Sequence, residues 1–218
     1  SSIIQYNLPD NCYNKEEFPK KQIFIHHTAG ASNPYSVVDY WKQKANKIAT
    51  AFIISGKPQN ANNKFKDGDI IQVFSSKYWA YHLGLKGDVF QRHGLPYQNL
   101  DKTSIAIELT NYGYLIKSTE GVYKTYVDSV IAPSEVTELI NEYRGYKFWH
   151  SYTYAQIASL KQLLLYLCNK YNIPKAYNTI FDMNTVCLSG TAGIWSHTSC
   201  RKDKTDCYPH PALLNMLL

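Results

Sequence analysis

A short apolar segment that ends in two histidines constrains the fold more than any other part of this chain. Ile23, Phe24 and Ile25 lead directly into His26 and His27. Consecutive β-branched and aromatic residues predict a buried strand, whose end would deliver polar side chains to a cleft. Neighbouring strand residues point to opposite faces of a sheet, so only one of the two histidines can face that cleft.

Several other segments predict strands around this one. Residues 51–54 and 69–74 predict a hairpin whose connection, residues 56–68, is long and polar. Residues 79–82 predict a short strand or strand edge, and residues 103–109 a further strand. Residues 110–132 predict an inserted excursion with a hairpin, and residues 1–21 an N-terminal arm laid over the domain.

Three helices are predicted from capping residues and apolar spacing. Asn33 and Pro34 predict a helix start, with Val38, Trp41 and Ala45 facing inward. A second helix is predicted from Ser134 to Tyr143, with Val136, Leu139, Ile140 and Tyr143 inward. Thr153 and Gln156 form a capping box before a longer apolar helix that Pro174 ends. With 218 residues, these elements fit a single α/β domain.

The strand at residues 103–109 contains one charged residue, Glu108, between Ile107 and Leu109. By the two-residue period, this carboxylate points away from the face that its neighbours use. A sheet covered on both faces tolerates such a charge only in a functional cleft. The face that Glu108 uses is therefore either solvent or the floor of a cleft.

A histidine and a cysteine near the C-terminus predict a zinc site. His197 and Cys207 are separated by a loop that can fold back on itself, and imidazole and thiolate are ligands that zinc prefers. A catalytic zinc takes three protein ligands, so the third ligand must come from a distant segment.

Five blocks, taken in order, resemble the zinc N-acetylmuramoyl-L-alanine amidases, a superfamily that includes the peptidoglycan recognition proteins. They span residues 22 to 209 and read Phe-Ile-His-His-Thr-Ala, Ala-Phe-Ile-Ile, Trp-Ala-Tyr-His-Leu-Gly, Ser-Ile-Ala-Ile-Glu-Leu and His197 followed by Asp-Lys-Thr-Asp-Cys. The resemblance implies a central mixed β-sheet flanked by helices, with residues 22–218 as the amidase domain, an insertion around residues 110–150 and residues 1–21 as the arm.

The resemblance also implies a zinc hydrolase that cuts the amide bond between N-acetylmuramic acid and L-alanine in peptidoglycan. Its metal ligands would be His26, His197 and Cys207. Some members use an aspartate as third ligand, and Asp206 stays open as the alternative, particularly if Cys200 and Cys207 form a disulfide. Glu108 and Thr205 would be catalytic, with Glu108 as general base. The expected substrate contacts are His82, Trp79, Asn111, Trp195 and Lys204.

Composition and charge exclude some classes of partner. The net charge is +6, but the basic residues are scattered, which disfavours nucleic acid and suits a polyanionic cell wall. No apolar run is long enough to cross a bilayer. We expect a monomer that is secreted or acts in the periplasm or cell envelope, although no signal peptide opens the chain. Discounting Cys207, four cysteines remain, an even number compatible with disulfides.

Two other functions compete with the hydrolase. A peptidoglycan recognition module would bind without cutting, but such members typically lack the cysteine ligand. A zinc protein that binds nucleic acid is disfavoured because the ligands are dispersed along the chain.

Overall fold

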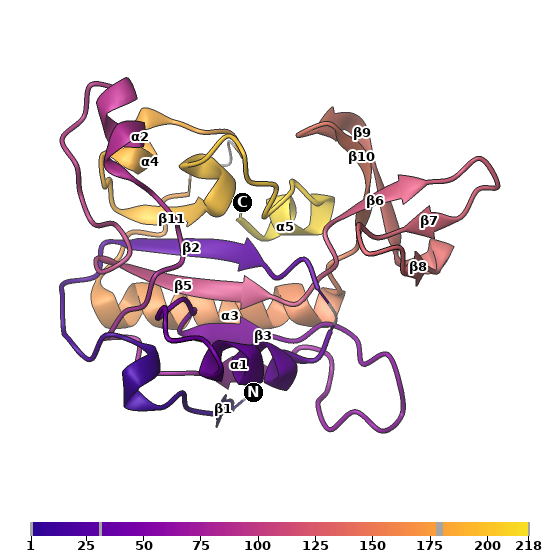
Figure 1. Ribbon diagram of the computed structural model, residues 1–218, viewed down its shortest axis with the longest axis horizontal. Coiled ribbons are helices and arrows are strands. Elements are labelled where there is room, and N and C mark those ends of the chain that lie inside the picture. Colours follow the sequence, from indigo (N-terminus) through magenta and orange to yellow (C-terminus); the bar gives the residue numbers. More distant parts are fainter. Residues whose placement is uncertain (1, 31, 178–180, 218) are drawn as a thin grey trace.

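Six strands form a central sheet in the order β1-β4-β3-β5-β2-β11 (Figure 1). The computed structural model describes residues 2–30, 32–177 and 181–217. The strands are β1 (Ile3–Gln5), β2 (Gln22–His27), β3 (Phe52–Ile54), β4 (Ile70–Gln72), β5 (Ser104–Leu109) and β11 (Gly193–Ser196). β3 and β4 pair antiparallel and the other neighbours pair parallel, so the sheet is mixed, as predicted.

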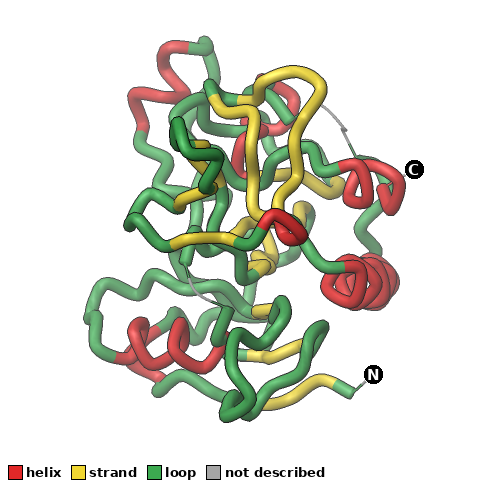
Figure 2. The backbone as a smooth tube through the Cα atoms, turned by 90° about the vertical axis from the view of Figure 1, so that its right-hand side faces the viewer, coloured by secondary structure: helices red, strands yellow, loops and turns green. Residues whose placement is uncertain are grey.

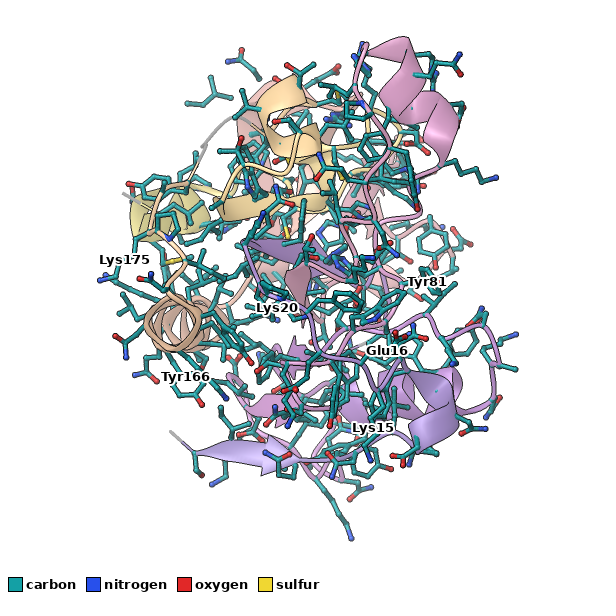
Figure 3. The ribbon with its side chains drawn as sticks, turned by 90° about the vertical axis from the view of Figure 1, so that its left-hand side faces the viewer. Lys15, Glu16, Lys20, Tyr81, Tyr166 and Lys175 are labelled. Carbon is teal, nitrogen blue, oxygen red and sulfur yellow. The ribbon has the colours of Figure 1, made fainter. Side chains whose placement is uncertain are left out.

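Successive residues of β2 face opposite sides of the central sheet and join two different apolar clusters. Ile23 and Ile25 pack in the larger cluster with α3 (Tyr154–Tyr171) and α5 (Pro211–Leu217). Phe24 packs in a smaller cluster with α2 (Gly87–Arg92) and α4 (Thr185–Leu188). His26 therefore shares its face with Phe24. Figure 3 shows α3 on one side of the sheet and Tyr81 on the other.

The predicted helix caps are confirmed. The Asn33 side chain accepts a hydrogen bond from the backbone of Tyr35 at the start of α1 (Pro34–Lys42), and Val38 and Trp41 are buried. Thr153 and Gln156 form the capping box of α3. Ala45 was expected to face inward but is exposed, since α1 ends at Lys42. The short 3₁₀ helices are η1 (Asp10–Cys12), η2 (Pro133–Glu135) and η3 (His197–Ser199).

A second, antiparallel sheet lies beside the central one, in the order β8-β7-β6-β10-β9 (Figures 1 and 2). Its strands are β6 (Tyr114–Lys117), β7 (Tyr123–Lys124), β8 (Val130–Ile131), β9 (Val136–Tyr143) and β10 (Tyr146–His150). The predicted helix at residues 134–143 is wrong: after η2 this segment is β9, which pairs with β10. Ile140, expected to be inward, is 95% exposed, whereas Leu139 is buried.

Several smaller expectations can be compared with the structure. Residues 3–5 of the expected arm form β1 at the edge of the central sheet. Within residues 79–82, only isolated bridges form, at Trp79 and Tyr81. All five cysteines are free and buried, so neither a Cys200–Cys207 disulfide nor any other is present. None of the helices among the described residues has the length and apolarity that a membrane crossing needs.

Candidate metal centre and cleft

Three side chains from distant segments converge at the carboxyl end of β2. His26 Nδ1 lies 3.1 Å from His197 Nδ1, and Asp206 Oδ2 lies 3.2 Å from each of these nitrogens. His26 comes from β2, His197 opens η3 directly after the neighbouring strand β11, and Asp206 lies in the loop that follows. Two imidazole nitrogens and a carboxylate oxygen form a donor set that suits zinc.

Hydrogen bonds on the far side of each ring leave both Nδ1 atoms free for a metal. His197 Nε2 lies 3.0 Å from the Leu83 carbonyl oxygen, which can only accept, so this nitrogen carries the proton. His26 Nε2 lies 2.9 Å from His82 Nδ1, and His82 Nε2 lies 2.8 Å from Ser104 Oγ. If His26 donates to His82, then His82 donates to Ser104, which fixes both tautomers and orients the His26 ring.

The electrostatics of the centre favour a neutral His26 and an ionised Asp206. Burial, together with neighbouring His197, lowers the pKa of His26 to about 4. Burial opposes the charge on Asp206, but His197 and His26 outweigh it and hold the pKa of that carboxyl well below its usual range. Neutral histidine and carboxylate are the forms that ligate a metal.

The third side chain beside the two histidines is that of Asp206, the alternative ligand, and not that of Cys207. Cys207 is fully buried among apolar side chains. Its backbone N–H donates to Ser196 Oγ, and the backbone N–H of Thr198 donates to the Asp206 carbonyl. These bonds fix the loop so that the Asp206 side chain reaches the centre while Cys207 packs into the core.

His27 and His82 take different places around the centre. His27 points to the opposite face from His26, as alternation predicts, and its Nδ1 lies 2.7 Å from the Tyr152 hydroxyl. Burial lowers the pKa of His27 to about 4. His82 was expected to contact substrate; it lines the cleft, and its ring bonds His26 on one side and Ser104 on the other. It therefore holds the His26 ring in place, a role that spacing along the chain does not reveal.

A cleft of about 900 Å³ opens over the centre. Glu108 lies on its floor, as expected, because the β2–β5 register pairs it with His26 and so puts both on one face. Lys204 and Thr205, which precede Asp206, also line the cleft. Burial, and then the charge of Asp206, raises the pKa of Glu108 to about 8, with Lys204 opposing this.

Three of the expected substrate contacts do not line the cleft. Trp195 is buried in the smaller cluster, where its indole N–H donates to the Thr191 carbonyl. Trp79 is buried against Tyr81. Asn111 is buried and bonds the backbone of His150 and Gly113, so it ties loops together. Trp195 and Asn111 satisfy their polar groups inside the protein, whereas the buried indole N–H of Trp79 has no hydrogen-bond partner among the described residues.

The cleft walls contain aromatic residues that sequence reasoning missed. Tyr40 and Trp41 of α1 line one side, and Tyr114 and Tyr146 of the second sheet, with Tyr126 of the β7–β8 connection, line another. The only signal for them in the sequence is the abundance of tyrosine, 19 residues, which does not say where they gather.

Comparison with known proteins agrees with this geometry. The family model described as N-acetylmuramoyl-L-alanine amidase matches residues 17–211. The search of curated proteins found no match.

Among solved structures, PlyL is 12% identical with a TM-score of 0.55, and the alignment covers 100% of this chain and 97% of PlyL. The hydrolase AmiA of Staphylococcus aureus, solved in complex with its ligand, is 12% identical with a TM-score of 0.54, over 100% of this chain and 81% of AmiA. AmpDh3 of Pseudomonas aeruginosa is 19% identical with a TM-score of 0.51, over 93% of this chain and 61% of AmpDh3. These structural similarities support the fold alone. The family model matches most of the chain, so the chain belongs to the N-acetylmuramoyl-L-alanine amidase family and is an amide hydrolase.

Proposed function

We propose that this chain is a zinc-dependent peptidoglycan amidase that uses His26, His197 and Asp206 as metal ligands. The observation that carries the proposal is the convergence of two Nδ1 atoms and one carboxylate oxygen, all within 3.2 Å of one another, on the floor of a large cleft. Zinc held there would polarise the amide carbonyl and make water a usable nucleophile near neutral pH.

Glu108 is the proposed general base. Its carboxylate shares the sheet face of His26 and has a raised pKa, about 8, which gives it a high affinity for a proton near neutral pH. Glu108 would take the proton of the attacking water and return it to the leaving nitrogen. Without that second transfer the amine would be a poor leaving group.

Lys204 and Thr205 are the proposed electrostatic partners of the reacting carbonyl. Both line the cleft immediately before Asp206, and Lys204 is close enough to Glu108 to oppose the rise of its pKa. An ammonium or hydroxyl donor in that position would stabilise the oxyanion that forms when water attacks.

The proposed substrate is the bond between the lactyl group of N-acetylmuramic acid and L-alanine of the stem peptide. We propose that the enzyme acts outside the cell or in the cell envelope, where that polymer lies, and that it works as a monomer. A basic protein suits an anionic wall through its long-range field.

The test is to treat purified sacculi with the zinc-loaded protein and to assay new alanine amino groups and new reducing sugar ends. An amidase frees amino groups without reducing ends, and Glu108→Gln should lose at least a hundredfold in rate. Sacculi that are bound but not cut would instead indicate a recognition module, and new reducing ends a glycosidase.

A further inference from the structure

The turn between β9 and β10 sends one arginine out of the second sheet towards the metal centre. Arg144 and Gly145 both have positive φ angles, 52° and 88°, as in a tight hairpin turn, and Tyr143 pairs with Tyr146 across it. The side chain of Arg144 is only 14% exposed, although its nearest carboxylate, Asp182, lies 3.9 Å away.

The guanidinium of Arg144 is surrounded by backbone carbonyl oxygens, and no carboxylate among the described residues is within hydrogen-bond distance of it. Nη1 lies 2.6–2.9 Å from three carbonyl oxygens and Nη2 lies 3.0 and 3.3 Å from two more. The acceptors are the carbonyls of Arg201, Lys202, Lys204, Phe181 and Thr198. A buried cation needs such partners, so the arginine and the loop fix each other's position.

Four of these carbonyls belong to the loop at residues 198–206, which carries Asp206. Lys204, whose carbonyl Arg144 holds, is two residues before Asp206. The Thr198 carbonyl accepts a hydrogen bond from Arg144, and the Thr198 N–H donates to the Asp206 carbonyl. The hydrogen bonds of Arg144 are therefore linked to both ends of the loop.

We propose that Arg144 is a positioning residue for the metal centre, holding the loop at residues 198–206 so that Asp206 and Lys204 reach the cleft floor. This inference rests on the proposed metal site. It makes the second sheet a structural part of the active site, because removal of the β9–β10 turn would release the loop.

The test compares zinc affinity, measured by competition with a chelator, for wild type, Arg144→Ala, Arg144→Lys and Arg92→Ala. Arg92 is a matched control because it is exposed and, among the described residues, pairs only with Asp88 of its own helix. Removing a group that orients a ligand typically weakens metal binding about 10–100-fold, which we expect for Arg144→Ala. Lysine should restore part of the affinity through its ammonium, and Arg92→Ala should bind as wild type.

The absorption spectrum of bound Co²⁺ gives a second readout, since it reports ligand geometry independently of folding stability. Arg144→Ala should change the spectrum, and Arg144→Lys should return it towards that of wild type. Wild-type affinity and an unchanged spectrum in Arg144→Ala would overturn the positioning role. A wild-type chain with no zinc affinity would instead overturn the metal site itself.

A different observation, the stacking of cleft tyrosines, carries a second inference. Tyr114 and Tyr146 stack with ring centroids 3.9 Å apart and planes at 15°, and both line the cleft. Each meets the fully buried Trp149 edge to face, at 6.3 and 6.1 Å, which holds the pair rigid. Tyr126, 57% exposed, lies 6.4 Å from Tyr114 on the same side of the cleft.

We infer that these three tyrosines form a subsite for a pyranose ring of the glycan, given the proposed peptidoglycan substrate. A rigid aromatic face complements the flat C–H face of a sugar, and the hydroxyls can bond its polar rim. The α1 side of the cleft combines the polar residues Asn33 and Ser36 with Tyr40 and Trp41.

The test compares hydrolysis of a sugar-bearing muramoyl peptide with that of a lactoyl peptide that lacks the sugar. Tyr126→Ala and Tyr146→Ala should raise KM about tenfold for the first substrate and leave the second unchanged. Tyr166→Ala is the matched control, since Tyr166 is half exposed on α3 and points away from the sheet (Figure 3).

Calorimetric titration with a peptide-free glycan disaccharide tests the subsite without catalysis. Wild type should bind it more tightly than Tyr126→Ala. Equal losses on both substrates, or equal disaccharide binding by the two proteins, would overturn the subsite. Hydrolysis of neither substrate by wild type would overturn the proposed reaction, and disaccharide binding would still decide the subsite.

Discussion

Replacing Glu108 with glutamine should make the metal-free protein more stable at high pH. The carboxyl has a pKa of about 8 in the folded protein against 4.5 as the ordinary value, because the cleft floor buries it and Asp206 repels its charge. A group with a raised folded pKa stabilises the protein fully below its unfolded pKa, and this stability is lost as pH rises towards the folded pKa. The relevant window therefore runs from about pH 4.5 to about pH 8.

The size of the effect follows from the two pKa values. At 1.36 kcal/mol for each pH unit, the difference amounts to roughly 5 kcal/mol in full. The carboxylate faces a cleft that water enters, so we expect about half of this, roughly 2–3 kcal/mol. Glutamine has nearly the same shape and no charge, so it should not show this loss.

Urea unfolding in the presence of a chelator measures the effect, with wild type and Glu108→Gln compared at pH 5 and at pH 9. The difference in unfolding free energy between the two proteins should grow by about 2–3 kcal/mol in favour of glutamine from pH 5 to pH 9. A difference that stays constant over this range would refute the assignment of Glu108 to a partly buried cleft floor beside Asp206.

Other predictions concern the ligand support, the second sheet and the core. His82→Ala should weaken zinc binding about 10–100-fold in a chelator competition, because His26 loses its partner, and unchanged affinity would contradict the proposed orientation of His26. In the strand β9 Ile140 faces solvent and Leu139 is buried, so Ile140→Thr should change the unfolding free energy by less than about 0.5 kcal/mol and Leu139→Ala should lower it by about 2–4 kcal/mol. Similar losses for the two variants would favour a helix with both residues inward. Trp149→Ala should cost about 3–5 kcal/mol in the same measurement, because Trp149 packs between Tyr114, Tyr146 and Tyr208, and a mild loss would mean that this aromatic cluster is loosely packed.

The local pattern of the chain predicts the part of the site that lies on regular strands. The two-residue period decides that His26 and His27 face opposite ways, and that Glu108 leaves the face of Ile107 and Leu109. The family resemblance then selects His26, and the β2–β5 register in the structure brings it beside Glu108.

The choice between Asp206 and Cys207 depends on contacts that local pattern does not contain. The two residues are adjacent in an irregular loop, and either type can ligate zinc. Bonds from Ser196, Thr198 and the distant Arg144 set the path of the loop. Zinc's general preference for thiolate favours Cys207, whereas the loop geometry brings Asp206 beside the two histidines.

The segment at residues 136–143 shows how tertiary pairing overrides spacing. Val136, Leu139, Ile140 and Tyr143 fit the spacing of a helix face. Three of the eight residues, Val136, Thr137 and Ile140, are β-branched, which also suits a strand. Pairing with β10 gives the segment its hydrogen-bond partners, and Ile140 then faces solvent.

The most direct measurement counts zinc by elemental analysis and freed alanine amino groups on sacculi for Asp206→Ala and Cys207→Ala. With His26, His197 and Asp206 as the ligands of an amidase, Asp206→Ala loses both the metal and the activity, while folded Cys207→Ala keeps one zinc per chain and cuts the wall. The opposite pattern, with zinc lost from Cys207→Ala and kept by Asp206→Ala, would contradict the metal centre described above.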